Sequence, residues 1–456
     1  MARIITSGKQ CVVNPLKMSQ PMGAALAFMG VENTMPLLHG SQGCTSFGLA
    51  LFVRHFREAI PLQTTAMSEV ATVLGGFENV EQAIVNLHAR TKPGLIGICT
   101  TCVSETKGDD LKGFIKIVRK SHPELDAIAL VDVSTPDFHG SFQDGWAAAV
   151  TRMVEELVDT PTFESSLSRR INVLPGCHLS PGDIDELRDI IEAFSLDPVF
   201  LPDLSGSLDG HVPDDFMPAT LGGISLEQIR RMGSACWTIA IGEQMRGTAI
   251  TLEHRTGVPY RLFDRLTGLT ANDALMEFLS GVSGVPVPVK FRRQRGQLVD
   301  AMLDGHFHFG GKRVVVGADP DLLAAMTHWL HEMGCVIQGA ITTTGSPALD
   351  TIPAEEVLLG DLEDLELRAS GADLIVTHSH GRQAAERLGI PLFRIGFPVF
   401  DRLGAGHQVT VGYRGTRDLI FDIGNVFLSH GHEPSPEMWA PQHPSANSLV
   451  ALDLPH

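Results

Sequence analysis

The sequence predicts an α/β protein with three Rossmann-like, doubly wound domains, in which parallel sheets are flanked by helices. Short, continuously apolar runs alternate with amphipathic helical stretches along almost the whole chain. Continuous apolar strands are typical of sheets that are covered on both faces. Segments with the same order of elements also recur at a spacing of about 140 residues, which indicates duplicated domains and not a short-repeat solenoid. The length of 456 residues also exceeds what a single hydrophobic core supports.

The expected strands are short runs rich in β-branched and other apolar residues. Each run is followed by turn residues and then by a helical pattern, as in repeated strand–helix units. In chain order, the runs lie at residues 95–99, 127–131, 171–174, 198–202, 237–241, 313–317, 373–377 and 391–395.

Two pairs of segments carry the internal repetition. Residues 171–203 and 313–340 share a strand, a glycine turn, a helix that starts with aspartate and a second strand. Residues 237–268 and 373–404 share a strand, a helix, a Gly-Val/Ile-Pro element and a DRL element. We therefore divide the chain near residues 165 and 300. The expected domains are an N-terminal α/β domain that carries Cys44 (1–165), a second α/β domain (166–300) and a third with a C-terminal tail (301–456).

Charge and composition exclude several classes of protein. A formal net charge of −18 argues against nucleic-acid binding, which needs clustered lysine and arginine. The basic stretch KFRRQRG (290–296) is interpreted as a solvated linker or a surface for an acidic protein. The first residues lack a signal-peptide core, and no run approaches the ~18 apolar residues of a membrane span. We expect a cytoplasmic protein without membrane contact.

Standard nucleotide and hydrolase motifs are missing from the sequence. No G-x-G-x-x-G or G-x-x-x-x-G-K-[ST] follows a strand, so nucleotide binding is not expected. In GADPDLLAA, Asp319 and Asp321 are expected to cap a helix and to repel an anion. No G-x-S-x-G elbow supplies a hydrolase nucleophile.

The seven cysteines are an odd number at irregular spacing, which predicts no disulfide framework and leaves thiol or metal chemistry open. CTTC (99–102) could be a redox pair or half of a zinc site, but no second half follows it. Cys99 ends a strand and is expected to point into the core. Packing is the expected role of Cys177, Cys236 and Cys335, which lie in or beside apolar strands.

Two histidine pairs are weaker metal candidates. His306 and His308, like His378 and His380, are two residues apart and would share a face if each pair lay in a strand. No acidic or thiol group accompanies them in a readable motif, so a ligand role is not favoured.

Cys44, in HGSQGCTSF, has the most specific setting. Like Cys102, it follows an apolar run and could stand at the carboxyl edge of a sheet, where doubly wound folds bind ligands. Gly40 and Gly43 would let the backbone approach a bulky inorganic group, and turn amides can stabilise negative sulfides. One thiolate cannot hold an iron–sulfur cluster, so other ligands would come from a second chain. Packing at a subunit interface is the alternative.

Several long motifs resemble the β-type chains of the nitrogenase molybdenum–iron family. They are NPLKMSQPMGAALAFMGVENTMPLLHGSQGC, RHFREAIPLQTTAMSEV, TTCVSETKGDDLKGFI and TPDFHGSF, and the similarity continues through PDLSGSLDGH and GYRGTRDLIFDIGN. The resemblance therefore covers nearly the whole chain. It implies three Rossmann-like domains, in agreement with the repeats.

The resemblance also shows where this chain departs from catalytic β-chains. Those chains give three cysteines to an eight-iron P-cluster. Cys44 matches the second and Cys102 the third, but Ser19 replaces the first. Asp137 stands where the family has a serine that joins the oxidised cluster. Because a hydroxyl is a poorer iron ligand than a thiolate, a full P-cluster is badly supported. Two nearby aromatic positions also differ, namely Phe47 in place of tyrosine and Leu74 in place of phenylalanine.

This pattern implies the β-type subunit of the scaffold complex on which the iron–molybdenum cofactor is matured. In such complexes a NifE-type α-chain and the β-type chain form an α2β2 heterotetramer with a shared 4Fe-4S cluster at each αβ interface. Three ligands come from the α-chain, and Cys44 matches the single β-chain ligand, which makes it the expected metal- and cofactor-binding residue. Three thiols from the α-chain and Cys44 already make four ligands, so Cys102 is not needed as one.

The same resemblance implies further partners. The precursor of the iron–molybdenum cofactor is held mainly by the NifE-type chain and is supplied by NifB, and the nitrogenase Fe protein docks to deliver molybdenum, homocitrate and electrons. No catalytic residue is assigned to this chain, and a biosynthetic scaffold is favoured over an oxidoreductase. The alternatives are a catalytic nitrogenase β-chain or a subunit similar to dark-operative protochlorophyllide reductase.

Overall fold

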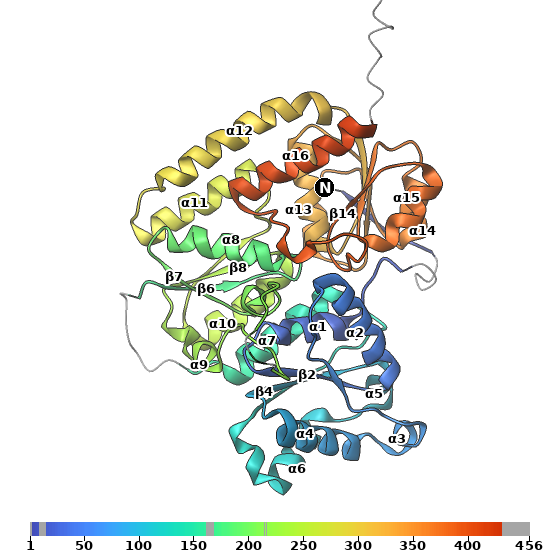
Figure 1. Cartoon of the computed structure of the whole chain (residues 1–456), viewed down its shortest axis with the longest axis vertical. Helices are drawn as coiled ribbons and strands as arrows, with labels where there is room; N and C mark the ends of the chain where they lie inside the picture. Colours follow the sequence, from blue (N-terminus) through green and yellow to red (C-terminus); the bar gives the residue numbers. More distant parts are fainter. Residues whose placement is uncertain (1, 9–14, 161–167, 214, 216, 431–456) are drawn as a thin grey trace, which may run out of the picture.

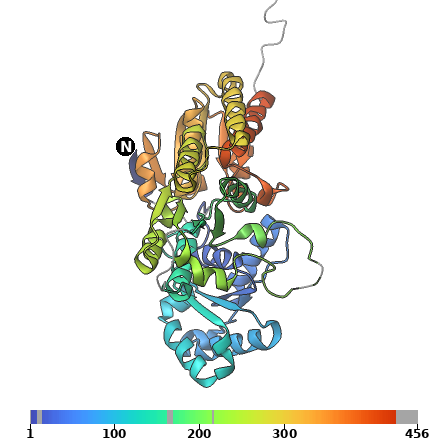
Figure 2. The ribbon, with the colours of Figure 1, turned by 90° about the vertical axis from the view of Figure 1, so that its left-hand side faces the viewer.

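The computed structural model describes residues 2–8, 15–160, 168–213, 215 and 217–430. Within these ranges, three parallel sheets are covered by helices, which confirms the predicted α/β class and its three Rossmann-like units. Figures 1 and 2 show the first and third sheets toward opposite ends of the long axis, so the three units meet near the middle of the molecule.

The first sheet has the order β3-β2-β4-β5. Its strands β2 and β4 are buried at every residue because helices cover both faces. On one face, α1 and α7 pack so closely that a Cβ on Gly23 would lie 1.8 Å from the carbonyl oxygen of Phe142. The elements are β2 (Thr34–His39), β3 (Gln63–Thr64), β4 (Leu95–Thr100), β5 (Ala129–Val133), α1 (Gln20–Met29), α2 (Gln42–Phe56), α3 (Glu69–Leu74), α4 (Phe77–Thr91), α5 (Cys102–Lys107), α6 (Leu111–Ser121) and α7 (Phe142–Leu157).

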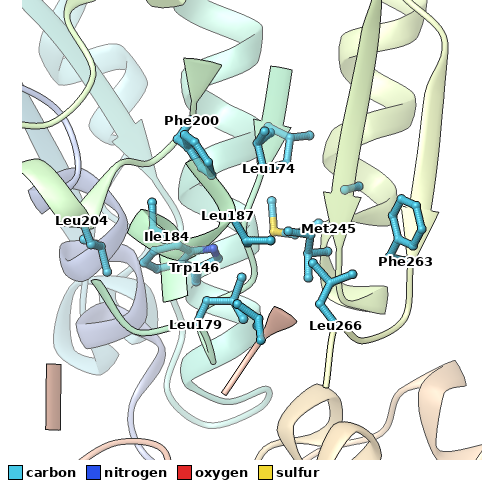
Figure 3. Close-up of a cluster of buried hydrophobic side chains, with 14 of the residues drawn as sticks. Trp146, Leu174, Leu179, Ile184, Leu187, Phe200, Leu204, Met245, Phe263 and Leu266 are labelled. Atoms are coloured by element: carbon cyan, nitrogen blue, oxygen red, sulfur yellow. The ribbon is translucent and has the colours of Figure 1, made fainter. Parts of the chain in front are cut away.

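The second sheet has the order β7-β6-β8-β9. Figure 3 shows its core, in which Trp146 of α7 lies near Ile184 and Leu187, so α7 contributes to two units. The indole Nε1 of Trp146 donates a hydrogen bond to the carbonyl of Pro175 at 3.0 Å. The elements are β6 (Arg170–Leu174), β7 (Asp197–Phe200), β8 (Trp237–Ile241), β9 (Tyr260–Phe263), α8 (Pro181–Glu192), α9 (Leu226–Arg230), α10 (Arg246–Thr256) and α11 (Leu269–Ser283).

The third sheet has six strands in the order β1-β12-β11-β10-β13-β14. Its edge strand β1 (Arg3–Thr6) comes from the segment assigned by sequence to the first domain and pairs with β12 (Glu356–Leu359). The boundaries near 165 and 300 stay predictions. The other elements are β10 (Arg313–Gly317), β11 (Val336–Thr342), β13 (Leu374–Thr377), β14 (Leu392–Arg394), α12 (Val289–Phe309), α13 (Pro320–Glu332), α14 (Leu362–Arg368), α15 (Arg382–Leu388) and α16 (Gly412–His430).

Two local expectations are wrong. The basic stretch 290–296 is no linker, because it forms the first turns of the 21-residue helix α12. Asp319 occupies the N-cap position of α13 but makes no side-chain cap; its carboxylate instead accepts a hydrogen bond from the Thr343 hydroxyl. Asp321 accepts a hydrogen bond from the backbone N–H of Gln244. The Asp321 bond therefore joins the third unit to the second, whereas the Asp319 bond stays within the third unit.

None of the helices in the described ranges combines the length and the apolar character that crossing a membrane requires.

Candidate metal-cluster site

Two cysteine-bearing turns leave the same edge of the first sheet. Strands β2 and β4 are parallel and pair His39 with Thr100 at their carboxyl ends. Cys44 is the third residue of α2, and Cys102 is the first residue of α5. Both thiols are exposed, as expected for ligands at the rim of a doubly wound sheet.

Hydrogen bonds fasten the two turns to each other. The hydroxyls of Thr101 and Ser104 both donate to the carbonyl of His39, each at 2.9 Å. A Cβ on Gly40 would lie 2.1 Å from the Thr101 hydroxyl oxygen. Gly40 therefore serves this close approach, which corrects the expectation that it faces an inorganic group. Gly43 has open space, since its Cβ would meet only the Ser41 hydroxyl at 4.0 Å.

Asp137 lies beside the thiol of Cys102. The pKa of this thiol is raised by partial burial and by the neighbouring charges of Asp137 and Cys44, although the Asp137 backbone N–H hydrogen-bonds to the sulfur. Asp137 is held in place by the backbone N–H of Gln20, 3.1 Å from its Oδ1. Ser19 directly precedes Gln20 as the N-cap of α1. The structure thus gathers Cys44, Cys102 and Asp137, and a raised pKa disfavours the thiolate that iron requires from Cys102.

An exposed apolar surface, which we call the cysteine collar, lies around these turns. It comprises Phe47 on α2, Val70, Val73 and Leu74 on α3, and Phe138 after β5. Phe47 is 62% exposed and Leu74 is 80% exposed. Figure 1 places α2, α5 and α3 along one side of the first unit. Grouped exposed apolar side chains mark a surface for another protein.

The other cysteines are not arranged as a second site. Cys99 is fully buried, and burial raises the pKa of its thiol, which confirms the core assignment and separates it from exposed Cys102. Cys335 is buried, whereas Cys177 and Cys236 are partly buried. In the described parts of the chain, no group of three or more His, Cys, Asp or Glu side chains is arranged to hold a metal ion.

The histidine pairs do not lie in strands. His306 and His308 belong to the last turn of α12, where residues two apart do not share a face. His378 is the buried N-cap of a short 3-10 helix, and its Nε2 lies 3.0 Å from the carbonyl oxygen of Leu16. A ligand role depended on each pair lying in a strand and sharing a face, and neither pair meets this condition.

Sequence reasoning missed a buried polar network behind the Cys44 turn. His39 Nδ1 lies 3.0 Å from the hydroxyl of Thr65, and His39 Nε2 lies 3.0 Å from the carboxylate of Asp109. The only signal in the sequence is a histidine at the end of an otherwise apolar strand.

The exposed Cys44 thiol fits one ligand of a metal cluster. The Sγ of Cys44 lies 3.6 Å from the Ser41 hydroxyl, in the first turn of α2. The free N–H groups of a first helical turn favour negative charge such as that of sulfide. The position of this thiol therefore suits one ligand of a cluster that needs further thiolates from elsewhere.

Known proteins resemble this chain over nearly its whole length. Residues 19–428 match the family described as nitrogenase component 1 type oxidoreductase. A nitrogenase iron-molybdenum cofactor biosynthesis protein NifN from Bradyrhizobium diazoefficiens is 60% identical, over 97% of each chain. The protein of that name from Klebsiella pneumoniae is 39% identical, over 95% of this chain and 94% of its own.

The fold also matches a solved nitrogenase structure. The structure titled nitrogenase Cp1 at pH 6.5 is 32% identical and superposes with a TM-score of 0.87, over 93% of this chain and 95% of its own. On the evidence of sequence and fold together, the chain belongs to the nitrogenase component 1 type oxidoreductase family.

Proposed function

We propose that this chain is the β-type subunit of a NifEN scaffold complex, on which the iron–molybdenum cofactor of nitrogenase is matured for nitrogen fixation. The observation that carries the proposal is the exposed Cys44 thiol within an apolar collar. The relatives at 39–60% identity are themselves named for cofactor biosynthesis.

In this proposal Cys44 supplies one thiolate to a 4Fe-4S cluster, and a NifE-type α-chain supplies three. A bound cluster of this kind supplies electron relay between the docked reductant and the maturing cofactor. The cysteine collar packs against the α-chain around the cluster, excludes water from it and fixes the relative position of the two chains. Partial burial and the neighbouring Asp137 charge raise the pKa of the Cys102 thiol, which favours Cys44 as the ligand from this chain.

The cofactor precursor is assigned mainly to the NifE-type chain, with NifB as its donor and the Fe protein as a docking partner, in the cytoplasm. In the second and third units, Cys335 and His378 are buried and Cys177 and Cys236 are partly buried. Such side chains are suited to packing and not to binding a large inorganic precursor.

A second surface supports assembly into an α2β2 heterotetramer. Leu303 and Phe307 lie four residues apart on α12 and are 66% and 86% exposed. Residues at this spacing form one stripe along a helix, which suits contact with a second αβ pair. We assign the stripe to a second copy of this chain, because the collar already serves the α-chain.

The competing function is a catalytic β-chain with a P-cluster or a protochlorophyllide reductase-like subunit. The exposure of Cys102 beside Cys44 favours it, since two thiols could serve a larger cluster. Ser19 and Asp137 at the positions of other P-cluster ligands oppose it.

Iron analysis separates these functions. The αβ complex is purified without oxygen and without precursor, as wild type, Cys44→Ala and, as the matched control, Cys102→Ala. The scaffold predicts about four irons and four sulfides per αβ pair, lost in Cys44→Ala and kept in Cys102→Ala. About eight irons that fall in both variants would establish the P-cluster function, and about four irons kept in Cys44→Ala would reduce Cys44 to packing.

A further inference from the structure

The buried network behind Cys44 has a defined direction of hydrogen bonding. Burial lowers the pKa of His39 despite the nearby Asp109, so the imidazole is neutral near pH 7 and carries one proton. Because Nε2 faces the Asp109 carboxylate at 3.0 Å, that proton lies on Nε2. Nδ1 is then an acceptor, and the Thr65 hydroxyl donates to it at 3.0 Å.

The network continues into the backbone that leads to Cys44. The backbone N–H of Gly40 donates to the Thr65 hydroxyl oxygen at 3.2 Å. Gly40 is followed by Ser41, the N-cap of α2, and Cys44 lies in the first turn of that helix. The order of the network is therefore Asp109, His39, Thr65 and Gly40.

Asp109 is fixed from the side of the second cysteine turn. Its backbone N–H donates to the carbonyl of Ser104 in α5 at 3.1 Å. The hydroxyl of Ser104 donates to the carbonyl of His39. The network thus closes a ring between the end of β2 and the helix that begins at Cys102.

A histidine between a hydroxyl and a carboxylate resembles a hydrolytic triad, but burial excludes that chemistry here. The side chains of His39 and Asp109 are 0% and 4% exposed, and Thr65 is also buried. The Thr65 hydroxyl is therefore closed to a substrate. A buried polar network of this kind fixes local structure.

We infer that Asp109, His39 and Thr65 are positioning residues that set the direction of the Cys44 sulfur toward its metal cluster. The inference rests on the proposed function. The Asp109 carboxylate selects the His39 tautomer, the tautomer orients the Thr65 hydroxyl, and the hydroxyl holds the Gly40 N–H from which α2 starts. Residues that support a metal ligand through hydrogen bonds tune a cluster without touching the metal.

The test uses Thr65→Val, which removes the hydroxyl at nearly constant volume, with Thr65→Ser as the rescue. Thr251→Val is the matched control, because within the described residues the hydroxyl of partly exposed Thr251 bonds only to the Gly247 carbonyl of the same helix, α10. In the anaerobic αβ complex we measure the cluster's midpoint potential by EPR-monitored titration and the rate of iron loss to a chelator. In the isolated chain we measure alkylation of Cys44 by iodoacetamide, with Cys102 of the same molecule as reference.

We expect Thr65→Val to shift the midpoint potential and to lose iron about fivefold faster, as the loss of one buried hydrogen bond allows. The Cys44/Cys102 alkylation ratio should change with it, and Thr65→Ser should restore all three quantities. Unchanged values in Thr65→Val, with intact folding by circular dichroism, would overturn the inference. A wild-type complex without iron would instead refute the proposed function, and the alkylation ratio would still decide whether the network positions Cys44.

Discussion

The carboxylate of Asp321 in α13 accepts a hydrogen bond from the backbone N–H of Gln244 at 2.9 Å, across the contact between the third and second units. Asp321 is 1% exposed, and its other oxygen has no hydrogen-bond partner among the described residues. Burial raises its pKa to about 6. At neutral pH the contact between the units therefore contains a buried carboxylate whose charge lowers the stability of the folded state.

We predict that Asp321→Asn stabilises the chain in alkaline solution and not in acid. A folded-state pKa of about 6, above the ordinary 3.8, means that the folded state gains stability below pH 3.8 and loses it as the pH rises through 6. The asparagine keeps the acceptor for Gln244 and carries no charge. Its free energy of unfolding should exceed that of the wild type at pH 8 by up to about 3 kcal/mol.

Thermal unfolding at pH 8 and pH 5 checks this prediction. The melting temperature of Asp321→Asn should rise above that of the wild type at pH 8, and the difference should shrink at pH 5. Asp300→Asn, at an exposed position of α12, serves as the control and should show little difference at either pH. Equal effects of Asp321→Asn at both pH values would contradict the assigned pKa.

The close approach of the two cysteine turns makes Gly40 sensitive to substitution. In Gly40→Ala the new methyl group would meet the Thr101 hydroxyl at 2.1 Å and push the turns apart, which we expect to cost about 1–3 kcal/mol of stability. Denaturant unfolding and iron content of the complex measure the effect. Gly43→Ala, with open space around it, should fold like the wild type. Equal losses in both variants would show that the contact with Thr101 is not the cause.

The cysteine collar predicts a specific assembly defect. Leu74→Asp places a charge in a surface that the α-chain covers in our proposal, so co-purification with the NifE-type chain should fall about tenfold or more. Leu74 is 80% exposed, so the variant chain alone should keep its melting temperature. Phe307→Asp, on the other apolar surface, is the control and should leave αβ pairing intact. A normal yield of αβ complex from Leu74→Asp would remove the collar from the interface.

The stripe on α12 gives a complementary prediction. Phe307→Asp should convert the heterotetramer into αβ pairs, because a charged side chain would be buried against its copy. Light scattering after gel filtration should show half the mass at unchanged iron per αβ pair. If Phe307→Asp kept the mass of the wild-type heterotetramer, the contact between αβ pairs would have to lie on another surface.

The sequence reveals most strands because their signal is local. All eight expected runs coincide with strands, since continuous apolar residues between turn signals need no distant information. Strand β1 gives no such signal, because its burial pattern is mostly exposed and its place depends on pairing with β12. Strand β9 is short and carries Arg261 on an exposed position. Edge strands of this kind are set by tertiary contacts.

The candidate site was likewise predicted from the sequence only in part. Cys44 is identified by a contiguous motif and by resemblance, and its exposure at the sheet edge is confirmed. The partners of His39 are Thr65 and Asp109, which lie 26 and 70 positions away in the chain. A single sequence carries no sign of which distant hydroxyl or carboxylate will meet a buried imidazole. The linker interpretation of residues 290–296 failed because a helix can be basic along its exposed face.

The edge position of β1 also orders events during synthesis. Arg3 pairs with Glu356, which the ribosome adds 353 positions later. The first unit can close around β2 and β4 while translation continues, because its strands lie within residues 34–133. Strand β1 can pair with β12 only after most of the chain has left the ribosome. Strand β1 is thus translated before every other described strand but is among the last of them to find its partner. A nascent chain stalled before residue 356 would expose a segment that a chaperone could hold.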